Sequence, residues 1–266
     1  MPLLGFGMHR TPNAPQLRTD LQTLIDQEQA LTAGSHDRLG SFVDVALSAI
    51  GTMNTFVISI GQAHFLSAAL QIAMQKSATL AFLSYIRSHH AQAEFNIRQA
   101  VEYTSLCTYL MAHPDEDVTG ETSGVGEGFR SPQAMSKKAY KWMDKTHPHF
   151  SKLLLELKSQ INDTTAHASV YQTHFTFDWQ GSSGETFQGS FFDEVDPNVT
   201  RLGLLSLARA IVVIVETLRV TAEKYGGFTV RDGLERELVS LERRILAHSA
   251  PLMAAMKVKT PSPPTS

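Results

Sequence analysis

The chain has few of the features that mark secreted, zinc-binding or nucleic-acid-binding proteins. Its one cysteine among 266 residues, Cys107, excludes both an intramolecular disulfide and a cysteine cluster for zinc. The net charge of -3 does not indicate a general polyanion binder. The first residues, MPLLGFGMHR, lack the basic start and long apolar run of a signal peptide. We therefore expect a soluble protein of the cytoplasm.

Charged residues are also missing from one long segment, Val45 to Gln75. A membrane span requires about 20 mostly apolar residues, but serine, threonine, asparagine, glutamine and glycine interrupt this segment. A buried or oligomer-facing helix explains the lack of charge better. The apolar run AIVVIV, Ala210 to Val215, lies between Arg209 and Glu216. We expect it to be a buried helix of a bundle, and we expect no membrane segment.

Apolar residues at helical spacing occupy most of the chain. An amphipathic helix is predicted over residues 13–32 from the positions of Leu17, Leu21, Leu24 and Ile25. The stretch Thr32 to Gly40 is predicted to break it. From about 41 to 112 the pattern is helical almost throughout, and it ends before Pro114 because the residue preceding proline disfavours helix.

The second half contains clearer helix boundaries. Ser131-Pro132, His147-Pro148 and Asp196-Pro197 each place proline where a helix begins, and two of them offer a capping side chain. Gly226-Gly227 is expected to end the long helix that begins at Pro197. A last helix is predicted over about 231–250.

Between the helices, the period of the apolar residues changes to two. The segments VYQTHFTFDWQ and TFQGSFFDE alternate around a Gly-Ser turn, which predicts a small β-hairpin over about 170–193. The sequence therefore predicts a mainly α, single-domain helical bundle with one inserted hairpin. Its expected parts are an N-terminal segment (1–12), the bundle with hairpin (13–250) and a disordered tail (251–266).

One polar pair invites a catalytic interpretation. Asp163 and His167 are four residues apart, so on a helix they lie on one face. A carboxylate beside an imidazole orients the ring and raises its pKa, as a general base requires. Ser159 cannot complete a triad, because eight residues of helix separate it from His167 by about 12 Å. The pattern favours a structural pair at a helix end and leaves the catalytic interpretation open.

A second group of charges follows the same spacing: Glu94, Arg98 and Glu102 are four residues apart in turn. Taken alone, this ladder is typical of a solvated helix face. Cys107 is predicted on the opposite side of this helix, buried and inert.

Neither a metal nor a cofactor is predicted. His89-His90, His147-x-His149 and His90-x3-Glu94 are the candidate ligand pairs, but the paired Glu-x-x-His motifs of di-iron bundles do not occur. The acidic, glycine-rich stretch 115–129 lacks the Gly-Lys-Ser/Thr ending of a phosphate loop. We expect it to be a mobile loop.

The order of these features resembles a known family. An apolar helix pair leads to Arg98-x3-Glu102, and a later helix ends in Asn162-x4-His167. This arrangement is similar to bacterial helical proteins distantly grouped with the HEPN superfamily, including abortive-infection-type defence proteins, over roughly residues 60–220. The resemblance implies paired protomers and, in active members, an Arg-x4–6-His motif that cleaves RNA. Here Asn162 stands where the phosphate-binding arginine belongs, which argues against catalysis.

A literal Arg-x4-His match, Arg243 to His248, lies on the last helix, outside the similar span, and chance accounts for one such match in a chain with 11 histidines. The leading hypothesis is a homodimeric protein that acts by binding RNA, a nucleotide or a protein partner. The alternative is a metal-independent ribonuclease of toxin or defence type, with His167 as base, Asp163 as its orienting group, and Arg98 or Arg243 as the phosphate cation. A structural or regulatory subunit that contacts its partner through loop 115–129 is the third hypothesis.

Overall fold

The structure is a computed structural model, and it describes residues 14–116, 132–162, 177–178, 188–189, 191–193 and 195–258. The chain is mainly helical, as the sequence predicted. The helices are α1 (Ala14–Ala33), α2 (Ser35–Leu39), α3 (Ser41–Thr55), η1 (Gln62–His64), α4 (Phe65–Ile86), α5 (His90–Ala112), α6 (Pro132–Thr146), α7 (Pro148–Ile161), α9 (Pro197–Tyr225) and α10 (Leu234–Val258). The strands are β1 (Val57–Ile60), β2 (Phe177–Asp178), β3 (Gln188–Gly189) and β4 (Phe228–Val230).

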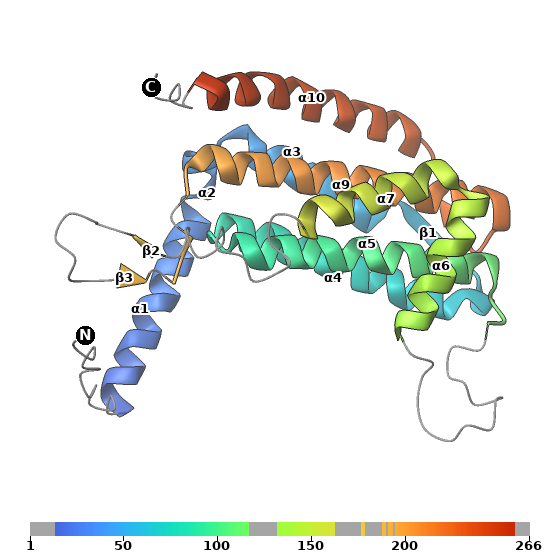
Figure 1. The fold of residues 1–266 in the computed structure, drawn as a ribbon, viewed down its shortest axis with the longest axis horizontal. Helices are drawn as coiled ribbons and strands as arrows, with labels where there is room; N and C mark the ends of the chain where they lie inside the picture. Colours follow the sequence, from blue (N-terminus) through green and yellow to red (C-terminus); the bar gives the residue numbers. More distant parts are fainter. Residues whose placement is uncertain are drawn as a thin grey trace, which may run out of the picture.

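Helix α9 forms the centre of the bundle. It contacts α3, α4, α5, α7 and α10, and α4 and α5 form a closely packed pair beside it (Figure 1). Leu204, Ile211 and Leu218 of α9 are almost completely buried. The run Ala210 to Val215 is therefore core, as predicted. Each buried leucine or isoleucine side chain stabilises the fold by about 1.5–3 kcal/mol relative to an exposed one.

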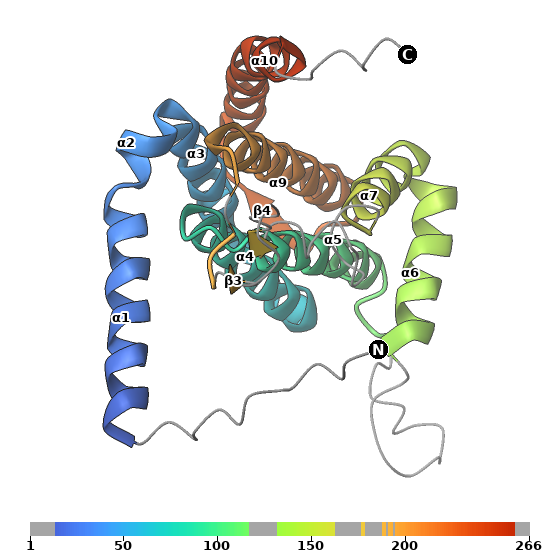
Figure 2. The ribbon, with the colours of Figure 1, turned by 60° about the vertical axis from the view of Figure 1, so that its left-hand side comes forward.

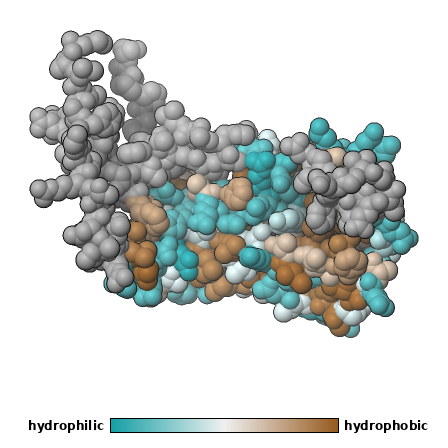
Figure 3. All heavy atoms as spheres, turned by 90° about the horizontal axis from the view of Figure 1, so that it is seen from below, coloured by the Kyte–Doolittle hydropathy of each residue, from teal (hydrophilic) through white to brown (hydrophobic). Residues whose placement is uncertain are grey.

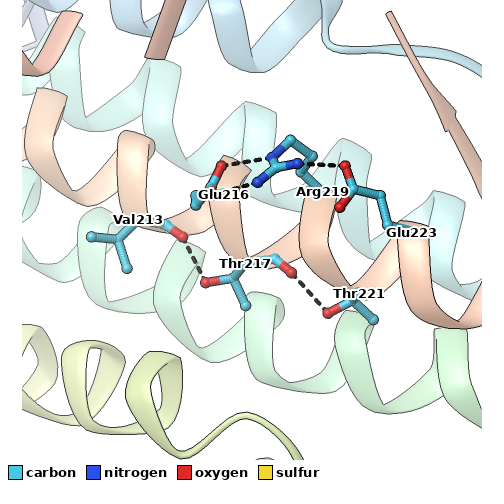
Figure 4. Close-up of polar contacts among 6 residues, drawn as sticks. All are labelled: Val213, Glu216, Thr217, Arg219, Thr221 and Glu223. Carbon is cyan, nitrogen blue, oxygen red and sulfur yellow. Dashed lines mark hydrogen bonds and ion pairs between the residues drawn. The ribbon is translucent and has the colours of Figure 1, made fainter. Parts of the chain in front are cut away.

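Polar groups on α9 are satisfied within the helix itself. The hydroxyls of Thr217 and Thr221 donate to the carbonyls of Val213 and Thr217, at 2.6 and 2.8 Å (Figure 4). On its half-exposed side, Arg219 lies between Glu216 and Glu223 and bonds to both (Figure 4). By length and composition α9 passes as a membrane span, yet 61% of its most apolar window is buried inside the fold, as in core helices of soluble proteins.

The predicted helix boundaries are largely confirmed. Helix α1 begins at Ala14, and α6 and α7 begin at Pro132 and Pro148. At the start of α9 the Asp196 carboxylate accepts a hydrogen bond from the backbone N–H of Asn198, at 2.9 Å. The helix ends at Gly226, whose φ of 79° suits a residue without a Cβ.

Two small antiparallel sheets accompany the helices. The predicted hairpin is confirmed by β2 and β3, which pair Phe177 with Gly189. The other sheet was not predicted: β1 pairs with β4 and joins the ends of α3 and α9. The sequence analysis placed VISI (57–60) inside a helical stretch. Its pairing partner, FTV (228–230), is far away in sequence, so no local pattern indicated the pairing.

Two other predictions are wrong. The predicted break at Thr32 to Gly40 contains the short helix α2, whose Leu39 is fully buried and so holds the turn against the core. The predicted tail (251–266) does not begin at Pro251, because α10 continues through this proline to Val258. Leu252 is buried and Met256 packs against the core, and this burial outweighs the missing backbone donor of Pro251.

The uncharged segment divides between a buried and an exposed helix. In α3 most apolar side chains are buried, as predicted. In α4 three large apolar side chains, Phe65, Ile72 and Leu80, are exposed. Figure 3 views the molecule from the side on which α4 lies and shows apolar areas between polar ones. That α4 faces a second protomer stays a prediction.

Candidate functional site

A cavity of about 350 Å³ lies where α5, α7, α9 and α10 meet. Most of its lining is apolar and comes from Ile97, Leu157, Val195, Val199, Leu202 and Met256. At one side, the end of α4 and the start of α5 contribute the polar side chains of Tyr85, His90 and Glu94. An apolar wall with a few polar groups at defined positions is typical of sites for small molecules.

Glu94 is held by a buried tyrosine. The Tyr85 hydroxyl donates to Oε1 of Glu94 at 2.6 Å, and Tyr85 itself is 1% exposed. The ring of Tyr85 packs closely against Gly203 of α9. A Cβ atom at position 203 would be 2.4 Å from Cε1 of that ring. Gly203 is therefore required for the position of Tyr85, and Tyr85 positions one oxygen of the carboxylate.

The surroundings of Glu94 make its charged form costly. Burial raises the pKa of Glu94, and the hydrogen bond from Tyr85 and the nearby His90 offset only part of this effect. Burial, together with the Glu94 carboxylate, also raises the pKa of Tyr85. Within the described residues, no lysine or arginine forms an ion pair with Glu94. Among the described residues, this carboxylate thus has Tyr85 as its hydrogen-bond donor and no lysine or arginine beside it.

His90 is fixed from three directions. Its Nε2 lies 2.9 Å from the Thr200 hydroxyl, and its Nδ1 lies 3.3 Å from Oδ2 of Asp193. The same Oδ2 accepts a hydrogen bond from the His90 backbone N–H at 2.6 Å, and so caps α5 from a distant part of the chain. The Asp193 backbone N–H donates to the Ser88 carbonyl at 2.8 Å. These contacts join the α4–α5 turn to the start of α9.

A threonine, a histidine and an aspartate in line resemble a nucleophile with its base. Thr200, however, is 0% exposed and does not line the cavity. A nucleophile must reach its substrate, so this geometry supports a positioning role for His90. The polar groups of the cavity are arranged to bind and orient a ligand.

The predicted ladder on α5 is only partly formed. Arg98 donates from Nε to Oε1 of Glu102 at 3.2 Å, and Lys158 of α7 reaches the same oxygen at 2.9 Å. Burial alone would raise the pKa of Glu102, but hydrogen bonds and charges from Lys158 and Arg98 lower it. Glu94 does not join this group, because it bonds to Tyr85. The prediction of one solvated ladder is therefore wrong at Glu94.

Of the other residues in the ribonuclease hypothesis, the structure describes Asn162. Asp163 and His167 lie outside the described residues. Asn162, the C-cap of α7, lines a surface hollow between α6 and α7, and its Oδ1 has no hydrogen-bond partner among the described residues. Gln160 and Ile161, immediately before it, line the cavity at Glu94. The ribonuclease role of Asp163 and His167 stays a prediction.

The literal Arg-x4-His match does not form a site. His248 lies against α3, with Nε2 at 2.9 Å from the Ser41 hydroxyl and its ring edge-on to Phe42. Arg243 is exposed. Residues five apart on a helix differ by about 140° in direction, so the two side chains of Arg243 and His248 diverge. The Arg243-x4-His248 match therefore does not bring the two side chains together, and the role of Arg243 as phosphate cation for His167 stays a prediction.

The candidate metal histidines have other contacts. His89 contacts the rings of both Phe191 and Phe192, and its Nε2 is 3.2 Å from Oε1 of Glu28. His147 lies against the rings of Trp142 and Tyr225. His90 contacts Asp193 and Thr200 as described above. In the part of the chain that the structure describes, no group of three or more histidine, cysteine, aspartate or glutamate side chains is arranged to hold a metal ion. Cys107 is fully buried, as predicted.

Comparison with known proteins finds no relative of this chain. No family model, curated protein or solved structure matches the chain. The resemblance to HEPN proteins, the homodimer and the cytoplasmic location therefore stay predictions. Loop 115–129 is the partner contact of the third hypothesis. Its residues from 117 on lie outside the described residues.

Sequence analysis missed Tyr85, Asp193 and Gly203. One signal for the site was present: the spacing His90-x3-Glu94, considered above as a metal pair, does bring both side chains to the same cavity. Tyr85, Gly203 and Asp193 carry no local motif. They come from three separate segments that only the packing of α4, α5 and α9 brings together.

Proposed function

We propose that the protein acts by binding a small, mostly apolar molecule that carries one cationic group, with that group against Glu94. The observation that carries this proposal is a carboxylate in a mainly apolar cavity of about 350 Å³ that forms no ion pair with a lysine or arginine among the described residues. A buried carboxylate is costly unless a positive charge or strong donors reach it. A ligand ammonium group would supply both.

The charge of the cavity lining disfavours two of the ligands that the sequence suggested, RNA and nucleotides. RNA and nucleotides carry phosphates, and the charged group in this lining is the anion Glu94. Like charges in a partly buried site repel strongly, so a phosphate is disfavoured there. An aliphatic or aromatic amine would place its hydrocarbon against Leu157 and Leu202, which line the cavity. This expectation extends the hypothesis of a protein that acts by binding without catalysis.

Three probes of equal size test the proposal: benzylamine, benzyl alcohol and benzoate, titrated calorimetrically into the purified protein. We expect benzylamine to bind more tightly than benzyl alcohol, and benzoate to bind most weakly. A hydrogen bond to a charged group contributes about 1.5–3 kcal/mol, which corresponds to roughly tenfold to hundredfold in affinity. Affinity for benzylamine should fall as the pH decreases and Glu94 takes up a proton.

Two variants test whether the preference for benzylamine depends on Glu94. Glu94→Gln should lose the preference for the amine and keep the affinity for the alcohol, because the amide still accepts from Tyr85 and retains the shape of the site. Glu102→Gln changes a glutamate on the same helix that does not line the cavity, and it should leave all three affinities unchanged. Equal binding of the three probes, or loss of the amine preference in Glu102→Gln, would contradict the proposal.

A further inference from the structure

A groove continues from the cavity along the surface of α9. Two further hollows, of about 520 and 260 Å³, lie between α7 and α10 with α9 as their floor. They share Leu153 of α7, Val212 and Val213 of α9, and Glu242 of α10. Figure 2 shows α7 and α10 on two sides of α9. The hollows therefore form one groove between two helices.

The direction of the helices sets the length of this groove. The starts of α7 and α10, His149 and Glu235, lie at the later part of α9, and both helices run back along it. The lining of the two hollows extends on α9 from Leu202 to Glu216. At 1.5 Å per residue this is about 21 Å, or four helical turns. A helix of that length would lie between α7 and α10 as one more helix of the bundle.

Apolar side chains are left exposed along the groove. Leu246 of α10 is 68% exposed and Val239 is 41% exposed, although both line the hollows. They are seven residues apart, so they lie on one face of α10, toward the groove. Buried Val212 and Leu205 form the floor beneath them. A partner that fills the groove must therefore present its own apolar stripe.

The rim of the groove is acidic. Glu235 and Glu242 are exposed, they are also seven residues apart on α10, and no ion pair within 4 Å is found for either among the described residues. Glu216 also lines the groove, but Arg219 already neutralises it (Figure 4). Arg209 is the basic side chain in the lining, together with His149. The charged side chains that α10 contributes to the groove lining are thus both carboxylates, and they favour lysine or arginine on the partner.

We infer that this groove binds an amphipathic, basic helix of a partner protein. Apolar residues at positions i, i+3, i+4 and i+7 of that helix pack against Leu246, Val239 and the α9 floor. Lysine or arginine residues beside that stripe pair with Glu235 and Glu242. This surface adjoins the cavity at Glu94 and shares Leu202 and Ser206 with it, but neither Glu242 nor Leu246 lines that cavity.

A pair of designed peptides tests the inference. One is a fluorescein-labelled amphipathic helix of about 18 leucine and lysine residues, and the other has glutamate at every lysine position. Binding to the full chain is followed by fluorescence anisotropy. The lysine peptide should bind at least about tenfold more tightly than the glutamate peptide. Equal affinity of the two would overturn the inference.

Matched variants test whether the lysine peptide binds in the groove. Leu246→Asp and Glu242→Lys should each weaken the lysine peptide about tenfold or more. Ile72→Asp, at a similarly exposed position on α4, and Glu156→Lys, on α7, lie outside the groove lining and should change it less than about twofold. Benzylamine binding should be retained in all four, which shows that the variants are folded.

Two outcomes would overturn the inference. One is peptide binding that Leu246→Asp and Glu242→Lys leave unchanged. The other is a wild-type dimer in sedimentation that Leu246→Asp converts to a monomer, because the groove would then be occupied by a second copy of the chain. Loss of peptide binding with retained benzylamine binding, in contrast, supports the groove and leaves the ligand proposal intact.

Discussion

Two glutamates on α5, about two turns apart, lie in opposite surroundings. Glu102 contacts Lys158 at 2.9 Å and Arg98 at 3.2 Å, and its pKa is lowered. Glu94 accepts from Tyr85, faces the cavity, and its pKa is raised. A paired carboxylate at a surface contributes modestly to stability, whereas an unpaired one beside a cavity is a cost that ligand binding can offset. Variants that remove the contacts of one glutamate at a time test this difference in surroundings.

Gly203→Ala should have the largest effect, because Gly203 leaves room for the Tyr85 ring that holds Glu94. Alanine favours helix over glycine, but the added Cβ would lie 2.4 Å from the Tyr85 ring. We expect a loss of about 1–3 kcal/mol in the free energy of unfolding, as for other overpacked cores, measured by urea denaturation. Gly51→Ala in α3 is the matched control, because a Cβ there meets nothing within 4 Å. That control should gain about 0.5–1 kcal/mol, and a gain in both variants would contradict the contact.

Asp193→Ala removes the acceptor that holds His90. The carboxylate accepts from the His90 backbone at 2.6 Å and is 14% exposed. We expect a loss of about 1–2 kcal/mol, typical of a helix cap. Asp44→Ala removes a carboxylate that is 52% exposed and contacts His36, and it should cost less than about 1 kcal/mol. Equal costs for the two variants would show that Asp193 does not cap α5.

Glu94→Gln and Glu102→Gln should have pH effects of opposite sign. The raised pKa of Glu94 means that wild type loses stability as the pH rises through it, above the ordinary value of 4.5, so Glu94→Gln should be the more stable protein at neutral pH. The lowered pKa of Glu102 stabilises wild type above 4.5, and that stability is lost as the pH falls. Glu102→Gln should therefore be less stable than wild type at neutral pH.

Unfolding curves between about pH 4 and pH 7 measure both differences. The Glu94 difference should shrink toward the acid end of this range, where its carboxyl is protonated in folded and unfolded chains. The Glu102 difference should begin to shrink only near and below 4.5, because the lowered pKa keeps this carboxyl ionised in the folded chain. Changes of the same sign in the two variants would mean that the two carboxylates do not differ in the way described here.

Arg98→Gln should have the smallest effect. Arg98 is one of two cations on Glu102, and Lys158 remains at 2.9 Å. We expect a loss of about 0.3–0.5 kcal/mol, which about 1 M sodium chloride should remove by screening. Calorimetric melting at low and high salt measures it. A loss above about 1 kcal/mol would show that Arg98 supports more than this surface pair.

The elements predicted correctly are those that local chemistry determines. Asp196-Pro197 and Gly226 act within a few residues of themselves, so the start and end of α9 could be inferred from sequence. The β1–β4 pairing could not, because it joins two segments that are far apart in the sequence. The end of α10 at Val258, beyond the predicted 250, could not be inferred either, since burial of Leu252 is a tertiary effect.

In the candidate site, too, some features follow from local sequence and others depend on tertiary packing. The spacing His90-x3-Glu94 correctly placed two side chains on one face of a helix, but their chemistry depends on Tyr85 and Asp193. The alternation of apolar residues does not reveal that Gly203 provides space for a ring. Sequence patterns therefore predicted the faces of helices, while the electrostatic difference between glutamates on one helix required the packing.

The most direct test of the proposed ligand site is to locate a bound amine. Crystals of the protein soaked with 4-bromobenzylamine would show the ring by the anomalous signal of bromine. We expect one peak in the cavity between Leu157 and Leu202, with the amine within hydrogen-bond distance of Glu94 and a clearly weaker signal in Glu94→Gln. A bromine peak elsewhere, or an equal peak in the variant, would contradict a cationic ligand site at Glu94.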